Sequence, residues 1–527
     1  MEEGSCDVLI TGGGLGGVAA ALSVLRLGCS AVIAEPTTWL GGQLTSQGVP
    51  PDEHPWIEHT GATSSYRGFR AAVRDSYRRR ETLTTRAHED PYLNPGGGWV
   101  SALCHEPKVG ASVLSDILAP YERDGRLHVL FEHRATAVSV DADRVTSVQL
   151  QDPAGASITV IPRFVLDATE EGDLLPLAGC EHVVGAESQA DTGEPHARAE
   201  GANPLEQQAV TWCFALDYEA GADHSIPRPK GYSFWRDYRA PFWPGPHLGW
   251  DTPDPITGRT LSRPLFSDTP EAQDLWTFRR LVCGAHYEGH AEVRDVTLVN
   301  WPQNDYWLGP IVGVPETVRA AHLSEAKELG SSLLYWLQND APRPDGETGY
   351  PGLRLRPDIL GTTDGFAMHP YVRESRRIKA CFRVLETHVG VEARAPVRGA
   401  EPLSDSVGIG SYRIDLHPTT AGRGYVDIAS WPFQIPLGAL VPVRIRNLLP
   451  ACKNLGVTHV TNGCFRLHPI EWNVGEVAGA LAASCINAQS EPRAVMERRE
   501  RVAEFQKLIT DLGVQLSWPE DIRLTPR

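Results

Sequence analysis

Long apolar runs are missing from this sequence of 527 residues. No window approaches the roughly 20 apolar residues that a membrane-spanning helix needs, so we expect no membrane partner. The opening residues, MEEGSC, carry acids where a secretory signal peptide carries bases. We therefore expect a cytoplasmic protein.

Cysteine pairs with metal-binding or redox spacing are missing too. The ten cysteines include no C-x-x-C pair, and most of them, such as Cys29, Cys180 and Cys485, fall in apolar segments. This pattern is typical of reduced core residues and predicts neither disulfides nor a bound metal.

Positive charge is scarce, because 49 Lys and Arg residues stand against 66 Asp and Glu residues and give a net charge of −17. A nucleic-acid-binding face would have to form against that field, so we expect a small-molecule substrate and no nucleic-acid partner. At about 150 residues per domain the length allows three to four units, of which we favour fewer and larger ones.

The chain is organised around a glycine-rich turn near its N-terminus. A short apolar run, Asp7 to Thr11, predicts a buried strand that leads into Gly12, Gly14 and Gly17 in G-x-G-x-x-G spacing, and then into a helix rich in Ala and Leu. Such a turn lets the backbone approach a pyrophosphate, and the helix N-terminus presents free N–H groups to the anion. A glycine-rich turn can serve packing alone, but the elements around this one favour a dinucleotide site.

The next strand indicates which dinucleotide fits. The run from Ser30 to Ala34 predicts a strand ending at Glu35, about 20 residues after the glycines, where such folds bind the adenosine ribose hydroxyls. An acid in that place favours an unphosphorylated ribose, so FAD or NAD fits and NADP does not. Gly41 and Gly42 would let the backbone pass close to a bulky cofactor, which favours FAD.

The predicted fold class is α/β, with a Rossmann-like FAD-binding domain that contains a β-meander and an inserted α+β substrate-binding domain. Residues 135–140, 144–151 and 157–160 alternate apolar and polar residues, as a small antiparallel meander does. The run from Arg163 to Asp173 predicts a further buried strand, whose end should face the cofactor.

We interpret the domain organisation as follows. Residues 1–185 form the first part of the FAD-binding domain, 186–420 an inserted substrate or cap domain, 421–490 the return of the FAD-binding domain, and 491–527 a C-terminal helix and tail. The aromatic residues of 232–250 suit stacking on a sugar or ring face, although filling a core is their more frequent role.

Two helices carry further expectations. The pattern from Ser64 to Arg80 places its aromatic residues in the core and its arginines, including Arg70 and Arg74, mostly on a solvated face. From Trp472 onward, small residues predict a helix that packs on the sheet and directs its dipole at the electron-rich edge of a reduced flavin.

Together these segments resemble the FAD-dependent oxidoreductase family, whose members carry an N-terminal FAD fold and a large inserted domain. The matching pieces cover most of the chain in the family's order: GGGLGG with Glu35, WLGGQLTSQGVPPDEH, DATEEGDLLPLAG, NWPQND, YVRESRRI, SYRIDLHP, and NLLPACKNLGVTH with CFRLHPIEWNVGEVAGALAA. The resemblance implies FAD but no particular substrate, although many members look like enzymes of carbohydrate or secondary metabolism. Glu476 stands where a Gln is expected, and an acid there would disfavour an anionic reduced flavin unless it points away.

The predicted cofactor contacts come from the glycine turn, the two following strand ends, the meander and the last helix. They are Gly12, Gly14, Leu15, Gly16, Gly17, Glu35, Pro36, Gly41, Gly42, Gln43, Ala135, Ala168, Thr169, Gly172, Asp173, Gly475 and Glu476.

Electrons are expected to come from the substrate, because no second G-x-G-x-x-G with a trailing acid is present for a nicotinamide coenzyme. We expect hydride transfer from a polar small molecule, an alcohol, a sugar-like compound or an amine, to flavin N5, with a base accepting the proton. Histidine suits this role because its unperturbed pKa is about 6.5. Of eighteen histidines, His468 is the first candidate, His459 the second and His417 the third, and Arg466 and Arg373 would orient an anionic or oxygen-rich substrate.

Alternatives stay open at this point. An NAD(P)H-using flavin monooxygenase of secondary metabolism, or a non-catalytic FAD-binding partner protein, would share the fold. The sequence does not distinguish an oxidase from a dehydrogenase, so the electron acceptor is O₂ or another compound. A covalent flavin link through His54, His59 or a cysteine also stays open, as does an oligomer.

Overall fold

The central element of the fold is a seven-stranded sheet. The computed structural model describes residues 3–80, 82–267, 273–289 and 293–527. The strands follow the order β3-β2-β1-β6-β5-β4, and β21 also pairs with β6. The parallel part contains β1 (Glu3–Thr11), β2 (Ala31–Glu35), β3 (Leu127–Phe131), β6 (Ser157–Asp167) and β21 (Leu448–Pro450), and the antiparallel part adds β4 (Arg134–Asp141) and β5 (Arg144–Gln151).

This arrangement confirms the predicted fold class, a Rossmann-like α/β sheet with a β-meander. One strand differs from the expectation, since β6 is continuous from Ser157 to Asp167 where the sequence predicted two strands. Its first half pairs with β5 in the meander, and nearly its whole length pairs with β1 in the parallel sheet. A single strand therefore couples the meander to the dinucleotide fold.

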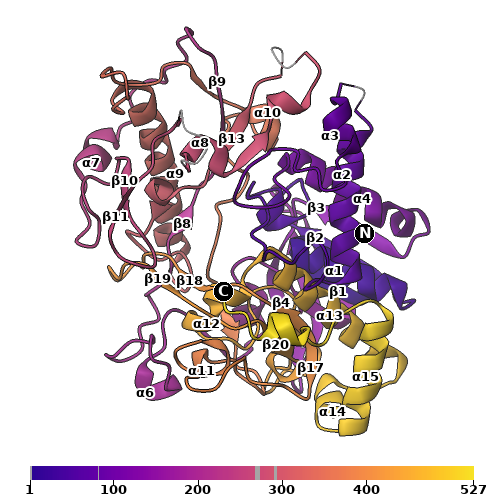
Figure 1. Cartoon of the computed structure of the whole chain (residues 1–527). Coiled ribbons are helices and arrows are strands. Elements are labelled where there is room, and N and C mark those ends of the chain that lie inside the picture. Colours follow the sequence, from indigo (N-terminus) through magenta and orange to yellow (C-terminus); the bar gives the residue numbers. More distant parts are fainter. Residues whose placement is uncertain (1–2, 81, 268–272, 290–292) are drawn as a thin grey trace.

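Helices α1 (Leu15–Arg26) and α13 (His468–Asn487) pack against each other beside the sheet (Figure 1). Their contact is made of backbone, because a Cβ added to Gly475 would lie 2.0 Å from the carbonyl oxygen of Gly16. The sequence predicted this helix from Trp472 onward, but α13 begins earlier, at His468. Its first turn therefore contains residues that the sequence pattern had left in a loop.

The inserted segment forms a second lobe around an antiparallel sheet in the order β12-β13-β9-β15 (Figure 1). These strands are β9 (Phe214–Tyr218), β12 (Arg280–Val282), β13 (Val296–Val299) and β15 (Leu353–Leu355), and the long helix α9 (Glu316–Asn339) accompanies them. Tyr232 and Trp235 are buried in a hydrophobic cluster with Trp301 and Tyr306, so these aromatic residues fill a core. The boundaries given for the domains stay a prediction.

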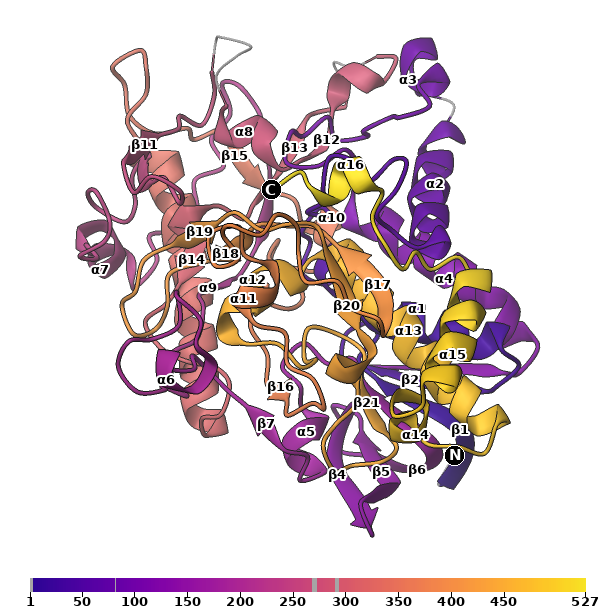
Figure 2. The ribbon, with the colours of Figure 1, turned by 60° about the horizontal axis from the view of Figure 1, so that its bottom comes forward.

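The C-terminal segment, predicted as one helix over 493–512, is two helices, α14 (Pro492–Met496) and α15 (Arg499–Asp511), which lie beside α13 (Figure 2). The remaining helices are α2 (Ser64–Arg78), α3 (Thr85–Glu89), α4 (Pro107–Arg123), α5 (Leu174–Leu177), α6 (Gln189–Thr192), α7 (Tyr232–Asp237), α8 (Leu275–Phe278), α10 (Pro357–Leu360), α11 (Glu386–Val389), α12 (His459–Phe465) and α16 (Glu520–Arg523), with 3-10 turns at Gly42–Leu44, Gly284–His286, Pro302–Asn304 and Leu437–Leu440. The remaining strands are β7 (His182–Val183), β8 (Val210–Thr211), β10 (Asp251–Pro253), β11 (Thr260–Ser262), β14 (Asp305–Tyr306), β16 (Arg377–Ile378), β17 (Ser406–Gly410), β18 (Ile414–Leu416), β19 (Val426–Ile428) and β20 (Phe433–Pro436).

Helix α2 corrects one expectation about its arginines. Arg70 and Arg74 are buried instead of solvated, and both form ion pairs with Glu58, while Arg70 also pairs with Glu53. The acids come from the loop before α2, so the helical pattern alone could not reveal them. Within the described part of the chain, no helix combines the length and the apolar character needed to cross a membrane.

Candidate cofactor and active site

A cavity of about 530 Å³ opens at the carboxyl ends of β1, β2 and β6. Strand β1 has β2 on one side and β6 on the other, so the strand order reverses at β1. Doubly wound folds bind their ligands at such a switch point. The inserted segment closes the opposite wall with Ile311, Val314, Arg319, His369 and Arg376.

The cavity brings together predicted contacts from several distant stretches of the chain. Those that line it are Gly12, Gly14, Glu35, Pro36, Gly42, Ala135, Ala168, Thr169 and Asp173. The other predicted contacts lie outside the lining of this cavity: Leu15, Gly16, Gly17, Gly41, Gln43, Gly172, Gly475 and Glu476.

The glycine turn forms a cradle of backbone atoms. Gly12 has a φ of +89°, and a Cβ there would lie 2.2 Å from the carbonyl oxygen of Ala168, so only glycine fits. A Cβ on Gly42 would lie 2.9 Å from the Cα of Gly14. The cradle is open to the cavity at the start of α1, where the helix N-terminus favours an anion.

Three of the glycines outside the cavity lining have packing roles instead. A Cβ on Gly16 would lie 1.8 Å from the carbonyl oxygen of Ala451, and one on Gly17 would lie 2.0 Å from that of Gly12. Gly475 contacts Gly16 in the same way across the α1–α13 interface. These glycines let α1 approach the turn, the strand end and α13 closely.

Glu35 lies at the cavity wall at the end of β2. Its carboxylate accepts hydrogen bonds from the N–H of Gly13 at 2.7 Å and from the N–H of Thr37 at 2.8 Å. Burial raises the pKa of Glu35 to about 7 despite these bonds. The carboxylate is therefore fixed at the cavity wall, and its role as an acceptor for sugar hydroxyls stays a prediction.

Glu476 points away from the cavity. Its carboxylate accepts hydrogen bonds from the Ser65 hydroxyl at 2.5 Å and from the Trp472 indole N–H at 3.2 Å. Of the acids on α13, Glu471 faces the glycine turn, where it accepts the N–H of Gly16 at 3.3 Å. Burial and the nearby Glu170 raise the pKa of Glu471 to about 7.

His468, the first candidate for the base, is fully buried at the start of α13. Its Nδ1 accepts the backbone N–H of Asp52 at 3.0 Å, which leaves the proton on Nε2. Burial also lowers the pKa of His468 to about 4. In this tautomer His468 is a hydrogen-bond donor rather than a base.

His459, the second candidate, begins α12 and donates from Nδ1 to Glu374 at 2.9 Å. Burial opposes ionisation of Glu374, but His459 and Arg377 lower its pKa to about 2. The same carboxylate pairs with Arg377 at 2.7 Å. His459 thus belongs to a buried structural network and does not line the cavity.

His417, the third candidate, has the geometry of an oriented base. Its Nδ1 donates to Asp305 at 2.6 Å, and its Nε2 lies 3.7 Å from Asp415. The side chain keeps 19% of its surface exposed, in contrast to the buried His468 and His459. An imidazole bound to a carboxylate through Nδ1 is the arrangement that general bases use, and here a second carboxylate, that of Asp415, lies close to Nε2.

The two predicted arginines join His417 in one cluster. Arg373 donates to Asp305 at 3.0 Å, and Arg466 donates to Asp415 at 3.0 Å and to the Tyr371 hydroxyl at 2.9 Å. None of these side chains lines the cavity, but the cluster is linked to its border, because Gln43, next to the lining Gly42, donates to the carbonyl oxygen of Arg466 at 3.0 Å. The structure therefore groups His417, Arg373 and Arg466 and separates them from His459.

Several residues at the cavity were not predicted from the sequence. Gln47 lines it with a fully buried side chain, and neither amide atom has a partner among the described residues. Glu170 and the buried Lys453 form an ion pair at the glycine turn. Glu170 follows the end of β6 and Lys453 follows the end of β21, and a position after a strand end is a sequence signal that could have indicated both as candidates.

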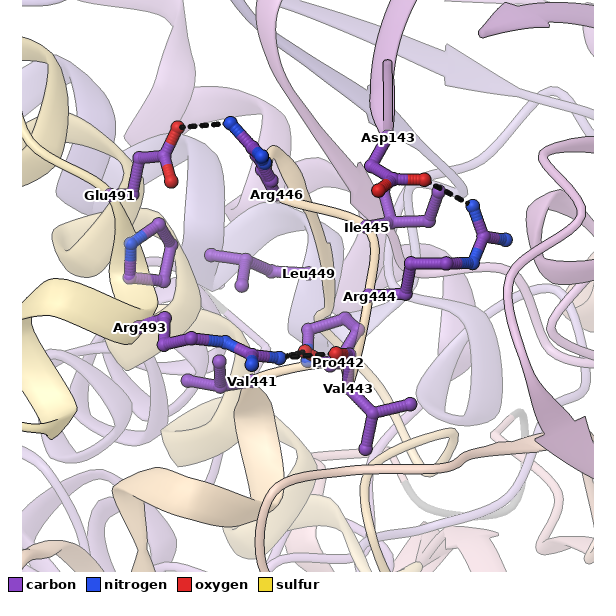
Figure 3. A pocket seen from close by; sticks show the side chains of 11 residues that line it. Asp143, Val441, Pro442, Val443, Arg444, Ile445, Arg446, Leu449, Glu491 and Arg493 are labelled. Atoms are coloured by element: carbon purple, nitrogen blue, oxygen red, sulfur yellow. Dashed lines mark hydrogen bonds and ion pairs between the residues drawn. The ribbon is translucent and has the colours of Figure 1, made fainter. Parts of the chain in front are cut away.

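A second hollow, of about 370 Å³, lies between residues 441–446 and the start of α14 (Figure 3). Its charges are paired, Arg444 with Asp143 and Arg446 with Glu491, while Arg493 donates to backbone carbonyls. These groups are already neutralised by protein partners, so this hollow is not a candidate for the reaction.

The cavity at the ends of β1, β2 and β6 fits FAD. The glycine cradle at the helix N-terminus suits a pyrophosphate, Glu35 suits a ribose, and the partnerless Gln47 amide suits a polar ring edge. His54 and His59 lie outside the lining, where they pack on aromatic residues.

Comparisons with solved structures give a distant likeness in fold. The chain matches p-nitrophenol 4-monooxygenase PnpA from Pseudomonas putida DLL-E4 at 11% identity over 98% of this chain and 88% of that one, with a TM-score of 0.35. It matches glycerol-3-phosphate dehydrogenase from Bacillus halodurans, solved with FAD, at 13% identity over 40% of each chain, with a TM-score of 0.24. Likenesses this low carry no argument about substrate or reaction.

A search of curated proteins gave no match. The family described as FAD dependent oxidoreductase matches residues 7–509, which is nearly the whole chain. FAD is accordingly the cofactor, and the protein is an oxidoreductase enzyme. On this match, the chain belongs to the FAD dependent oxidoreductase family.

Proposed function

We propose that this enzyme oxidises a neutral, hydroxylated small molecule, an alcohol or sugar-like compound, or a corresponding amine, and that His417 accepts the proton. One observation carries the proposal. A buried array of arginines and aspartates reaches the border of the cofactor cavity through the carbonyl of Arg466, which accepts a hydrogen bond from Gln43 beside the lining Gly42. His417 is bound to one of these aspartates.

The array is balanced in charge. Burial of so many charges is tolerable only because each finds a partner. Three cations face three anions: Arg279, Arg373 and Arg466 with Asp52, Asp305 and Asp415. None of the described residues accepts a hydrogen bond from the Nε of any of the three arginines. The array therefore has free N–H donors but no net positive charge that would attract an anion. This combination favours a neutral, oxygen-rich substrate over a carboxylate.

Aromatic rings border the same array. Tyr425 lies with its ring centroid 5.3 Å from that of His417, and it packs against the cluster formed by Trp243 and Trp307. His247 is enclosed by these indoles, and its ring nitrogens have no partner among the described residues. Rings beside hydrogen-bonding groups suit a sugar-like ring that presents both an apolar face and hydroxyl edges.

Asp305 keeps His417 ready to accept a proton. Although burial opposes its ionisation, Arg373 and His417 lower the pKa of Asp305 to about 2. The ionised carboxylate binds Nδ1–H and so orients Nε2 as the nitrogen that accepts the proton in this proposal. The carboxylate of Asp415, 3.7 Å from Nε2, then stabilises the imidazolium that forms.

When bound, FAD supplies the two-electron acceptor at N5. The O–H or N–H proton of the substrate moves to Nε2 of His417. Its C–H bond breaks with both electrons leaving as hydride, and a C=O or C=N bond forms. Arg373 and Arg466 hold the substrate oxygen in line during this step.

The test is an anaerobic screen of polyols, sugars, amines and amino acids, with NADPH included, in which flavin absorbance is followed. We expect bleaching by a neutral hydroxylated compound or an amine. His417→Asn should slow bleaching by about 100-fold or more, because general-base catalysis contributes on that order, and should flatten the pH profile. His128→Asn, an exposed histidine on β3, is the matched control and should bleach normally.

Two results would contradict the proposal. Rapid bleaching by NADPH with none by the other compounds would favour a monooxygenase. Unchanged bleaching in His417→Asn, with FAD content and melting temperature also unchanged, would show that another group accepts the proton.

A further inference from the structure

A buried ion pair lies in the glycine cradle. The side chain of Lys453 is fully enclosed, and its ammonium group pairs with the carboxylate of Glu170. The Oε1 of Glu170 lies 3.4 Å from the place of a Cβ on Gly14 and 2.7 Å from that of a Cβ on Gly42. This oxygen is buried and has no hydrogen-bond partner among the described residues.

The position of Glu170 conflicts with the cofactor's phosphates. Glycines in this turn have no side chain so that the backbone can approach a pyrophosphate. The carboxylate of Glu170 occupies the space that Gly14 and Gly42 leave free, and Oε1 of Glu471 lies equally close to the place of a Cβ on Gly14, at 3.4 Å. Because burial raises the pKa of Glu471 to about 7, Glu170 is the acid that brings the firm negative charge. Two anions in one enclosed site repel each other strongly, so Glu170 and the pyrophosphate exclude each other.

Lys453 needs an anion in either state. A fully buried ammonium without a partner is strongly destabilising, and Glu170 is the one described carboxylate within ion-pair distance of Lys453. Its other contact is the sulfur of Cys452 at 3.8 Å, which is a weak acceptor. If Glu170 leaves the cradle, the pyrophosphate is the anion that can replace it.

We propose that Lys453 is the counter-charge of the FAD pyrophosphate, and that Glu170 stands in for the phosphates in the cofactor-free protein and is displaced when FAD binds. Glu170 lies in the loop between β6 and α5, with 16% of its side chain exposed, so rotation carries its carboxylate toward solvent. The neighbouring acids are tied elsewhere, Glu171 to Arg319 and Asp173 to Arg376, and they stay in place.

Titration of FAD into the deflavinated full-length protein, followed by flavin fluorescence, tests this exchange. Glu170→Gln removes the competing charge and should lower the Kd for FAD about tenfold, since like charges across a site cost several kcal/mol. Lys453→Met should raise the Kd for FAD and for ADP but leave that for riboflavin, which has no phosphate, unchanged. Lys453→Arg keeps the charge and should bind FAD close to normally.

Thermal melts give a second readout. In Glu170→Gln the cofactor-free protein keeps Lys453 without its anion, so its melting temperature should fall, and added FAD should raise it by more than in the wild type.

Glu171→Gln is the matched control, because it removes one charge from the same cavity without touching the glycines. An equal gain in FAD affinity in this variant would attribute the effect to overall cavity charge and overturn the exchange. Weaker FAD binding in Glu170→Gln would show that Glu170 binds the cofactor itself, and would overturn it as well. Equal loss of FAD and riboflavin binding in Lys453→Met would remove Lys453 from the phosphate site.

Discussion

Substitution of Gly475 by alanine tests whether this glycine serves packing or the cofactor. The sequence predicted a cofactor contact, whereas the structure places Gly475 against Gly16 in the α1–α13 interface. An added Cβ would lie 2.0 Å from the Gly16 carbonyl oxygen and 2.4 Å from its Cα. Both neighbours are backbone atoms, so no side chain can move aside.

Two effects of opposite sign determine how far Gly475→Ala changes the free energy of unfolding. Alanine in a helix is favoured over glycine by about 1 kcal/mol. To relieve the clash, however, α13 and α1 must separate by about 1 Å, and overpacking of a tight interface costs about 1–3 kcal/mol, occasionally more. Because Gly479 makes the same contact with Ala20 one turn later, the separation also loosens that contact. We expect a net destabilisation of about 1–2 kcal/mol.

Urea unfolding of the deflavinated and the FAD-loaded protein measures this effect. A packing defect lowers the midpoint in both forms by a similar amount, whereas a lost cofactor contact lowers only that of the loaded form. Gly68→Ala is the matched control, because Gly68 is exposed in α2 and nothing lies within 4 Å of an added Cβ, so its midpoint should stay or rise. An unchanged cofactor-free midpoint in Gly475→Ala would refute the reasoning.

Three further substitutions test buried charges. Arg70→Ala should destabilise the protein by about 3–5 kcal/mol in urea unfolding, because Glu53 is left buried without its cation, and a loss below 1 kcal/mol would contradict this. Glu35→Gln should raise the Kd for FAD about tenfold in fluorescence titration by weakening a charged acceptor for the ribose, and an unchanged Kd would remove Glu35 from the site. Burial raises the pKa of Glu194 to about 7 from its usual 4.5, so the free energy of unfolding should fall as pH rises through that range. Glu194→Gln lacks this fall, so its stability relative to the wild type should be greater at pH 8 than at pH 5 by at most about 3 kcal/mol, and parallel pH curves for the two proteins would contradict it.

The range of the interactions explains which predictions succeed. The places of Gly12 and Glu35 follow from consecutive residues, since a strand, a tight turn and a second strand end lie within one short segment. Arg70 was misplaced because its partner Glu53 lies 17 residues earlier, outside the helix whose pattern was being read. The pair of Lys453 with Glu170 joins residues 283 positions apart, and no local pattern indicates it.

The histidines show the same limit for the active site. Position near α13 favoured His468, but a single backbone N–H, that of Asp52, fixes its tautomer and makes it a donor. The sequence did not indicate the partner of His417, because Asp305 lies 112 residues away in the inserted segment. The role of a histidine depends on which group its second nitrogen meets, and only the fold determines this.

The segment from Arg373 to Arg377 fixes the cluster around His417 relative to the cofactor cavity. Arg373 pairs with Asp305 of the inserted lobe at 3.0 Å, while Arg376 pairs with Asp173 beside the cavity at 3.2 Å. Arg377 pairs with Glu187, close to where the inserted segment begins, also at 3.2 Å. The pairs of Arg373 and Arg377 are buried, whereas Asp173 is more than half exposed. Buried pairs contribute little net stability, but each penalises any arrangement that leaves its charge unpaired. The two buried pairs, with Arg376 tied to Asp173 between them, therefore specify one position of Asp305, and with it of His417, relative to the cavity.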